Sequence, residues 1–402
     1  MNTERLESIQ STLRQLGLEG WLLYSFRDSN PIATRMLGLT PEVHQSRRWA
    51  CLIPAEGRVR GLTHRIEPHI ARMMPGDVIE YSTHQEFERG LGSLLAGLGQ
   101  VAMEYSHHNA IPVISRVDAG TVELVEATGV QVVSSGALIA HLEARLDSAQ
   151  QESALRAGRA VREVMMASFS LIRDRIANAT ALNEYDVQRF ILEEFERRGL
   201  ETDHPPIVGV GPNSANPHYE PTAEGSSPIR LGDFVLIDLW AREKDATSVF
   251  GDITWTGFVG ESVPAEHAEV FDVVRRARDA AFDRAVVAMA GDEAITGADL
   301  DDAARAVITE AGYGEYFVHR TGHSITTELH GAGANLDNYE TRDTRPILRS
   351  TSFSIEPGIY LTGRFGIRSE LDVLITDDGE VIATSDPVQE EIVAILAPVP
   401  AA

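Results

Sequence analysis

Cysteine is almost absent from this chain of 402 residues, in which Cys51 is the only one. No disulfide can form within the chain, so a reducing cytoplasm is the expected compartment. Long apolar runs are missing too, and no stretch reaches the ~18 residues that a membrane span requires. The start, Met-Asn-Thr-Glu-Arg, lacks the basic and apolar regions of a secretory signal peptide. We therefore expect a cytoplasmic protein with no membrane partner.

Basic side chains are also scarce, with 35 Lys and Arg against 60 Asp and Glu and a formal net charge of -25. This acidity argues against nucleic acid and anionic membranes as partners, and its plainest consequence is solubility. Apolar residues make up 43% of the chain, which is enough for ordinary hydrophobic cores. The length predicts two or three domains.

The order of predicted elements divides the chain into two parts. The first, residues 1–147, alternates helices and strands and is predicted to be an α/β domain. A long helix over 148–177 opens the second part, residues 148–402, which mixes helices with strands in an α+β pattern. The predicted helices cover 3–17, 64–75, 86–97, 148–177, 184–198, 266–289 and 298–311, and the predicted strands of the first part cover 20–25, 48–54 and 100–104.

Asp238 interrupts the apolar run Phe234-Val-Leu-Ile-Asp-Leu-Trp240. Both faces of this predicted strand are apolar apart from Asp238, so the strand is expected to be covered on both sides. An unpaired carboxylate in such a place would cost several kcal/mol or lose its charge. A divalent cation is one partner that removes this cost.

Three further acids repeat the pattern. Asp252 follows fourteen residues after Asp238, a spacing that suits adjacent antiparallel strands joined by a turn. Glu356 ends a predicted strand before Pro-Gly, and Glu370 lies in a predicted strand over residues 367–375. Four carboxylates can neutralise two divalent ions. Together with one imidazole, from His323, they suit manganese, cobalt or zinc better than a metal that prefers thiolates.

The order Asp, Asp, His, Glu, Glu resembles that of the pita-bread metallopeptidases, in the branch that contains prolidase (Xaa-Pro dipeptidase) and aminopeptidase P. The resemblance covers roughly residues 150–395. It implies a pita-bread catalytic domain in which helices pack on a curved, largely antiparallel sheet with the acids on its concave face. The first part resembles, less distinctively, the creatinase/prolidase-like N-terminal domain of the same enzymes. The phrases that carry the resemblance are VLIDLW, GDITWTG, HRTGHSITTELHG, FSIEPGIY and FGIRSELDVLITDDG.

The resemblance implies two divalent metal ions, with manganese favoured and cobalt or zinc as alternatives. Asp252 and Glu370 would bridge the ions, Asp238 would complete the shell of one, and His323 and Glu356 that of the other. Two such ions ~3.5–4 Å apart lower the pKa of a shared water toward neutrality. Glu356 resembles the carboxylate that accepts the proton from this water and passes it to the departing proline nitrogen.

Four other side chains are implied as substrate-binding. His218 and His330 would donate hydrogen bonds to substrate carbonyls or to the developing oxyanion, and His319 would line the same pocket. Each of the three histidines has a purely structural alternative. Arg368 either holds Glu370 or Asp372 through a bidentate bond or reaches the substrate.

Small peptides with a free amino terminus and proline in second place are the implied substrates. Dipeptidase and aminopeptidase P remain open alternatives, and we favour the dipeptidase because the chain lacks obvious long insertions. A dipeptidase must recognise the carboxylate beyond the proline. Arg47 or Arg48, from the same chain or from the partner in an expected homodimer, is a candidate to close the pocket, although a solvated pair is the plainer interpretation.

Three positions depart from the family pattern. Trp255 stands where most relatives have arginine, Thr326 where they often have glycine, and Gly331 where they have an acid. None removes a metal ligand, but each bears on the shape of the pocket and on the strictness for proline. Two other functions stay open: a metal-free hydrolase of the creatinase type and an inactive pita-bread interaction protein.

Overall fold

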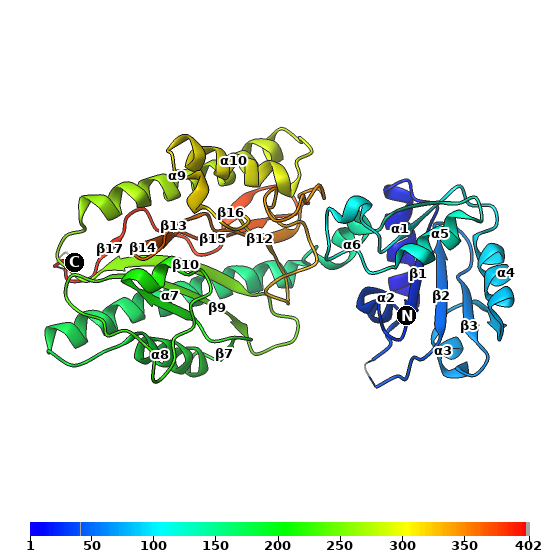
Figure 1. The fold of residues 1–402 in the computed structure, drawn as a ribbon, viewed down its shortest axis with the longest axis horizontal. Coiled ribbons are helices and arrows are strands. Elements are labelled where there is room, and N and C mark those ends of the chain that lie inside the picture. The colour runs from blue at the N-terminus through cyan, green and yellow to red at the C-terminus, as the bar shows by residue number, and fades with distance from the viewer. Residues whose placement is uncertain (41, 399–402) are drawn as a thin grey trace. The chain divides into compact units, whose positions relative to one another are not determined.

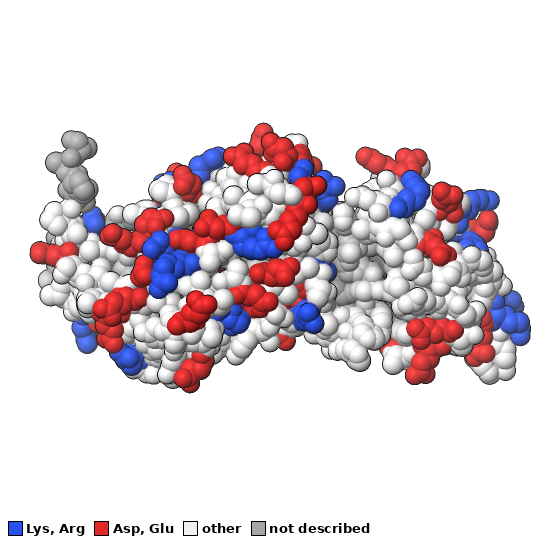
Figure 2. Space-filling view, turned by 90° about the horizontal axis from the view of Figure 1, so that it is seen from above, with Lys and Arg blue, Asp and Glu red and all other residues white. Residues whose placement is uncertain are grey.

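The computed structural model describes residues 1–40 and 42–398. The chain divides into two compact units, Met1–Leu142 and Glu143–Ala402. Among the described residues, no helix has both the length and the apolar character needed to cross a bilayer. On the face drawn in Figure 2, acidic side chains are spread over both units with basic side chains among them, rather than gathered in one patch.

The first unit is an α/β domain around a six-stranded sheet with the order β4-β3-β2-β1-β5-β6. Strands β1, β2 and β3 pair antiparallel, whereas β4, β5 and β6 join their neighbours in parallel. Its strands are β1 (Gly20–Phe26), β2 (Arg48–Pro54), β3 (Arg60–His64), β4 (Asp77–Tyr81), β5 (Gln100–Met103) and β6 (Gln131–Ser134). Its helices are α1 (Thr3–Gln15), α2 (Pro31–Leu37), α3 (Pro68–Met73), α4 (His84–Leu95), α5 (Ala119–Glu126) and α6 (Gly136–Glu143), with a 3₁₀ turn, η1 (His107–Asn109).

The helix predicted over 64–75 is wrong at both ends. Pro68 begins α3 because its fixed φ suits the first turn of a helix. Gly76, at φ +91, follows its end, and a side chain there would bring Cβ within 2.0 Å of the Val59 carbonyl oxygen. Strands β3 and β4 flank this short helix.

The pair Arg47 and Arg48 also lies in this unit, where Arg47 is exposed and the Arg48 guanidinium lies 4.1 Å from the centroid of the Phe87 ring.

The second unit is built in layers around antiparallel strands. Figure 1 shows α7 and α8 on one side of the strands and α9 and α10 on the other. The helices are α7 (Ser148–Ala177), α8 (Glu184–Arg197), α9 (Ala265–Ala290) and α10 (Gly297–Glu310), with 3₁₀ turns η2 (Gly211–Ala215) and η3 (Gly314–Tyr316). The strands are β7 (Leu200–Glu201), β8 (Ile207–Val210), β9 (Phe234–Glu243), β10 (Gly251–Phe258), β11 (Ser324–Ile325), β12 (Thr351–Ile355), β13 (Gly358–Leu361), β14 (Phe365–Arg368), β15 (Leu371–Ile375), β16 (Val381–Ala383) and β17 (Val393–Ala394).

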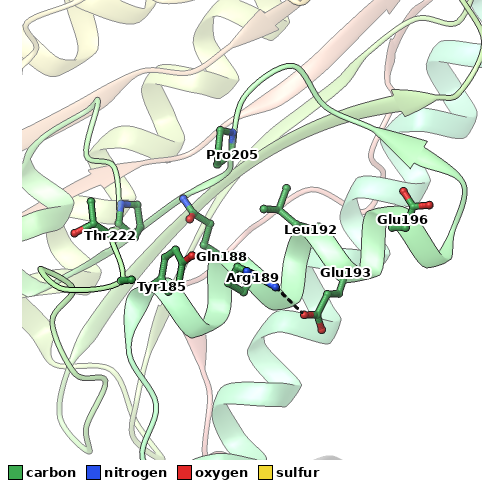
Figure 3. Close-up of a pocket in the computed structure, with 10 residues that line it drawn as sticks. Tyr185, Gln188, Arg189, Leu192, Glu193, Glu196, Pro205 and Thr222 are labelled. Atoms are coloured by element: carbon green, nitrogen blue, oxygen red, sulfur yellow. Dashed lines mark ion pairs between the residues drawn. The ribbon is translucent and has the colours of Figure 1, made fainter.

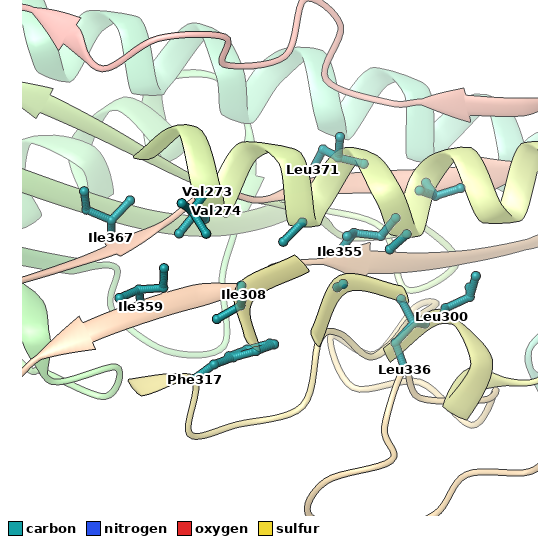
Figure 4. Packing of buried hydrophobic residues seen from close by; sticks show 14 of the residues in the cluster. Val273, Val274, Leu300, Ile308, Phe317, Leu336, Ile355, Ile359, Ile367 and Leu371 are labelled. Carbon is teal, nitrogen blue, oxygen red and sulfur yellow. The ribbon is translucent and has the colours of Figure 1, made fainter. Parts of the chain in front are cut away.

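Capping and burial explain why these helices form. Capping boxes close the first turns of α7, α8 and α10, and each satisfies backbone N–H groups that the helix leaves free. One apolar core lies between α9, α10 and the strands beneath them, as Figure 4 shows. Its side chains include Val274 of α9, Ile308 of α10, Ile355 of β12, Ile367 of β14 and Leu371 of β15.

The strands form three sheets rather than one continuous sheet. Strand β9 pairs with β7, β8 and β10, and β17 joins β10 in parallel; β11, β12, β15 and β16 form a second sheet, and β13 and β14 a third. The single strand predicted over 367–375 is wrong. It breaks at Ser369 and Glu370 because β14 pairs with β13 whereas β15 pairs with β12. At the break, the Glu370 N–H donates to the Thr254 carbonyl of β10 at 3.1 Å.

Candidate metal centre

A cavity of about 810 Å³ opens within the second unit. Every residue that the sequence suggested for the site lines it, although these residues come from six separate parts of the chain. They are His218, Asp238, Asp252, His319, His323, His330, Glu356, Arg368 and Glu370.

Strand register places the first two acids side by side. In the antiparallel pair β9–β10, Asp252 lies opposite Trp240 and Thr254 lies opposite Asp238. Asp238 and Asp252 therefore project from the same face as diagonal neighbours. The antiparallel pairing that their spacing predicted is confirmed, and β9 is buried along most of its length, as its apolar faces predicted.

The other three acid and histidine side chains are held by turns next to strand ends. The Glu356 N–H donates to the Thr321 carbonyl at 2.7 Å, and the His323 N–H donates to Ser354 Oγ at 3.0 Å. Gly322 allows this close approach, since a Cβ there would lie 2.0 Å from the Ser354 carbonyl oxygen.

Asp252, His323 and Glu370 form the tightest group, with one candidate ligand atom from each lying within 4.8 Å of the others. His323 Nε2 lies 3.6 Å from Asp252 Oδ2 and 3.6 Å from Glu356 Oε1. These separations are too long for hydrogen bonds but suit ligands that share an ion at about 2.0–2.2 Å. His323 Nδ1 lies 3.3 Å from the Ser324 carbonyl oxygen, an acceptor that favours a proton on Nδ1 and leaves the Nε2 lone pair free for a metal.

Burial of two carboxyl groups is only partly compensated by the protein. Desolvation, followed by repulsion from neighbouring carboxylates, raises the pKa of Asp252 and of Glu370 well above the usual range. Asp252 Oδ1 is buried and has no hydrogen-bond partner among the described residues. A divalent cation would satisfy this oxygen and offset the repulsion, so the residues present fit the metal that the donor set implies.

Arg368 has a different partner from those the sequence suggested. Its Nη2 donates to Asp238 Oδ2, and its Nε donates to Thr254 Oγ1 at 2.9 Å. The hydroxyl of Thr254 in turn donates to Glu370 Oε2 at 2.7 Å. Arg368 therefore contacts Asp238 directly and reaches Glu370 only through Thr254. Asp238 turns toward this guanidinium and is not one of the tightest group.

Asp372 was not among the predicted site residues, although it lies directly behind the site. Its Oδ2 accepts a hydrogen bond from the Asp252 backbone N–H at 2.6 Å, and its Oδ1 is buried without a partner among the described residues. Desolvation and the nearby Asp252 carboxylate raise the pKa of Asp372 well above the usual range. The signal in the sequence was its place two residues after Glu370, on the same face of the predicted strand.

The three pocket histidines differ in their surroundings. His319 Nε2 lies 2.7 Å from the Tyr360 hydroxyl and Nδ1 lies 2.7 Å from the Arg320 carbonyl oxygen, so both ring nitrogens have partners. Burial lowers the pKa of His319 to about 4, which keeps the ring neutral at pH 7. The His330 ring centroid lies 4.4 Å from that of His323. His218 is exposed on the loop after η2.

Two of the three departures from the family pattern are physically coupled. A Cβ at Gly331 would lie 2.8 Å from Thr326 Cγ2, so the threonine occupies space that a side chain at 331 would need. Trp255 faces away from the cavity, into the apolar layer between β10 and helices α7 and α8. None of the three lines the cavity, so any effect on its shape is indirect, and their bearing on the strictness for proline stays a prediction.

A second hollow, of about 620 Å³, lies on the outer side of α8 (Figure 3). Tyr185, Gln188 and Leu192 line it from the helix, and Pro205 and Thr222 line it from the facing loops. Pro205 also lines the acidic cavity, so the two hollows adjoin.

Comparison with known proteins agrees with this architecture. The model of metallopeptidase family M24 matches residues 152–377, and the chain belongs to this family. The layered unit around the acids is the pita-bread catalytic domain, preceded by an α/β domain.

Similar curated proteins include an "Xaa-Pro dipeptidase" of Lactobacillus delbrueckii, 31% identical over 241 residues, which are 60% of each chain. A "probable dipeptidase PepE" of Mycobacterium tuberculosis is 35% identical over 51% of this chain and 50% of its own. The matches thus span about half to three-fifths of the length of these relatives.

Among solved structures, dipeptidase PepE from Mycobacterium ulcerans has a TM-score of 0.64 at 24% identity, and the match covers 98% of this chain and 97% of that one. Prolidase from Thermococcus sibiricus has a TM-score of 0.60 at 23% identity, covering 98% and 99%.

Proposed function

We propose that this protein is a metal-dependent Xaa-Pro dipeptidase. The observation that carries the proposal is the cavity in which two strand carboxylates, two turn carboxylates and one imidazole converge beside three further histidines. Membership of the M24 family and the dipeptidase names of several relatives support it.

Two divalent ions, manganese foremost and cobalt or zinc as alternatives, are the proposed cofactors. The proposed ligands are Asp238, Asp252, His323, Glu356 and Glu370. When bound, such ions supply Lewis acidity and lower the pKa of water toward neutrality. Asp252 and Glu370 are the proposed bridging ligands, as the resemblance to the family implies, and the raised pKa values of these two carboxyl groups are consistent with a need for a cation.

Glu356 is the proposed proton carrier. Burial alone would raise the pKa of Glu356, but the nearby His323 and Arg368 outweigh it and hold that pKa below the usual range. The carboxylate is therefore ionised at neutral pH and can accept a proton. Ser354 Oγ donates to its Oε1 at 3.2 Å, which fixes its orientation.

The substrate would be held by the residues around these acids. His218 and His330 are the proposed donors to the substrate carbonyl or the developing oxyanion, and His319 and Arg368 are the other proposed substrate-binding residues. The cavity is also lined by the apolar side chains of Ile207, Trp240 and Leu329, which suit a pyrrolidine ring.

The proposal extends to the whole chain. An N-terminal domain over 1–147 and a catalytic domain over 148–402, a cytoplasmic location and a homodimer rest on the chain's composition and on its resemblance to the family. Light scattering on the purified protein tests the dimer. A monomeric mass would remove any role for a partner's Arg47 or Arg48 in closing the pocket.

One time course tests the substrate class. Purified protein with measured metal content is given Xaa-Pro dipeptides and the matching Xaa-Pro-Yaa tripeptides. Preferential cleavage of the dipeptide is expected, and preferential cleavage of the tripeptide would assign aminopeptidase P instead. Cleavage by metal-free protein would favour the creatinase type. No cleavage by the metal-loaded protein would favour the inactive interaction protein.

A further inference from the structure

Glu184 is a buried acid that neither the predicted ligand set nor the proposed mechanism uses. It begins α8, yet its carboxylate accepts four hydrogen bonds from outside that helix. Oε1 accepts from Val210 N at 2.7 Å and Asn213 Nδ2 at 2.9 Å. Oε2 accepts from Tyr219 Oη at 2.7 Å and Ser227 N at 2.6 Å. An ionised carboxylate offers about four acceptor positions, so these donors fill them all.

The four donors belong to the segment 210–227, part of which lines the cavity. Val210 and Ser227 are its two ends, and Tyr219 lies between them. Asn216, His218 and Glu220, within the same segment, line the cavity. Tyr219 thus sits between two cavity-lining residues while its hydroxyl is bonded to Glu184.

Other hydrogen bonds hold residues 216–220 only locally. In the described part of the chain, Asn216 N donates to the Asn213 carbonyl, and His218 N and Tyr219 N donate to Asn216. The bond from Tyr219 to Glu184 is therefore the one that ties this stretch to a helix. Tyr185 and Gln188 of α8 line the second hollow of Figure 3, whose facing wall includes Pro221 and Thr222, directly after the 216–220 stretch.

We infer that Glu184 is a positioning residue for His218, acting through the hydroxyl of Tyr219. The inference rests on the proposed function, in which His218 contacts the substrate. Glu184 itself touches no reacting atom. Its carboxylate fixes the position of residues 216–220 relative to the proposed metal ligands. It thereby fixes the direction in which the His218 imidazole points.

The test compares two small substitutions with a matched control. Tyr219→Phe deletes only the hydroxyl and keeps the ring that packs on the core. Glu184→Gln keeps the shape but turns one oxygen into an NH₂ group that faces two donors. Glu104→Gln is the control, because Glu104 is equally buried and accepts from Trp21, Asn30 and Ser135, but in the first unit. Each change is made in the wild type and in His218→Ala.

Both test variants should lose about ten- to a hundredfold in kcat, the scale on which misplaced catalytic groups act, with KM and metal content little changed. In the His218→Ala background, the same changes should have almost no further effect. Backbone amide hydrogen exchange in residues 216–220 should be faster in both Tyr219→Phe and Glu184→Gln than in the wild type. The control should lower thermal stability while leaving kcat, its response to His218→Ala and this exchange unchanged.

Additive losses in the two backgrounds would overturn the inference, since a merely structural role would act independently of His218. Unchanged exchange in residues 216–220 would overturn it as well. If the wild type does not hydrolyse Xaa-Pro peptides, the proposed function fails, and the exchange measurement still decides whether Glu184 anchors the stretch.

Discussion

Carboxyl groups that line the same cavity carry opposite pKa shifts. Burial and mutual repulsion raise the pKa of Asp252 and Glu370, whereas His323 and Arg368, against the effect of burial, lower that of Glu356. Environments that separate the pKa values of neighbouring acids commonly separate their roles. The acids with raised pKa need a cation, and the acid with lowered pKa is ready to take a proton.

Glu356→Gln and Glu370→Gln should both disable catalysis, through different deficits. Glu370→Gln removes a proposed bridge between the ions, so metal content should fall. Glu356→Gln removes a ligand and the proton carrier together, so turnover should stay ~10²–10⁴-fold low even with excess metal. Metal analysis and steady-state kinetics on both variants make the comparison. Near-normal turnover in Glu356→Gln would show that another group carries the proton.

The histidines should separate metal binding from catalysis. His323→Ala should lose metal, because its Nε2 faces Asp252 and Glu356 and alanine offers no ligand. His330→Ala and His218→Ala should keep metal and lose ~10²–10³-fold in turnover, the usual cost of deleting one donor to an oxyanion. Metal content and kcat are measured for each. Equal metal loss in all three would mean that they act as one ligand cluster.

Some single residues carry a signal that the sequence alone reveals. A charge inside an apolar strand is costly wherever that strand lies, so Asp238 was informative before any fold was known. Thr254 and Tyr360 gave no such signal. A hydroxyl is unremarkable in sequence, and only strand register and chain reversal bring these two to Arg368 and Glu370.

At the scale of elements, capped helices were predicted closely and short strands poorly. The helix predicted over 148–177 coincides with α7, because the capping box of Asp147 and Gln150 marks its start. Strand β4 was missed because it is a largely exposed edge strand without an apolar face. The break between β14 and β15 depends on which strands pair with each, and alternation within 367–375 does not encode that.

Strand β10 gives a prediction at this scale, because its register places Thr254 between Arg368 and Glu370. Thr254→Val keeps the branched shape but leaves Arg368 Nε and Glu370 Oε2 each without this partner. Metal affinity should fall about 10–100-fold, as is usual for partners that orient metal ligands. Thr256→Val is the control, since Thr256 is equally buried on β10 but its hydroxyl donates to Gln389 Oε1 at 3.5 Å. Equal losses for both, measured by metal titration, would mean that strand stability and not ligand orientation is responsible.

At the scale of the whole molecule, composition argues against several classes of partner, and the order of the candidate metal ligands is what resembles the family. Neither decides between dipeptide and longer substrates, because that depends on what closes the cavity beyond the proline. The residues around the metal centre all belong to one unit, so metal binding should couple to the stability of that unit in particular.

Stripping the metal with a chelator should abolish hydrolysis, and manganese or cobalt should restore it, because the donor set is oxygen-rich with one imidazole. Activity is followed on one Xaa-Pro dipeptide before and after dialysis against each ion, and magnesium addition serves as a comparison. Full activity in protein shown to be metal-free would contradict the two-metal proposal and favour the creatinase type.

The metal-free protein should also become less stable as the pH rises. The pKa values of Asp252, Glu370 and Asp372 are raised in the folded state, so the folded chain holds protons that the unfolded chain releases. By linkage, this stabilisation is complete below the ordinary carboxyl pKa and is lost as the pH climbs toward the raised values. Melting temperatures of chelated protein should therefore fall as the pH rises above the ordinary carboxyl pKa, whereas bound manganese, which replaces the protons as the source of positive charge, should make the melting temperature less dependent on pH. Asp252→Asn removes one of the buried acids and should weaken the pH dependence of the melting temperature in chelated protein.

A melting temperature that rises with pH in the chelated wild type would mean that the buried acids are neutralised by the protein itself, and the need for a cation at this site would disappear.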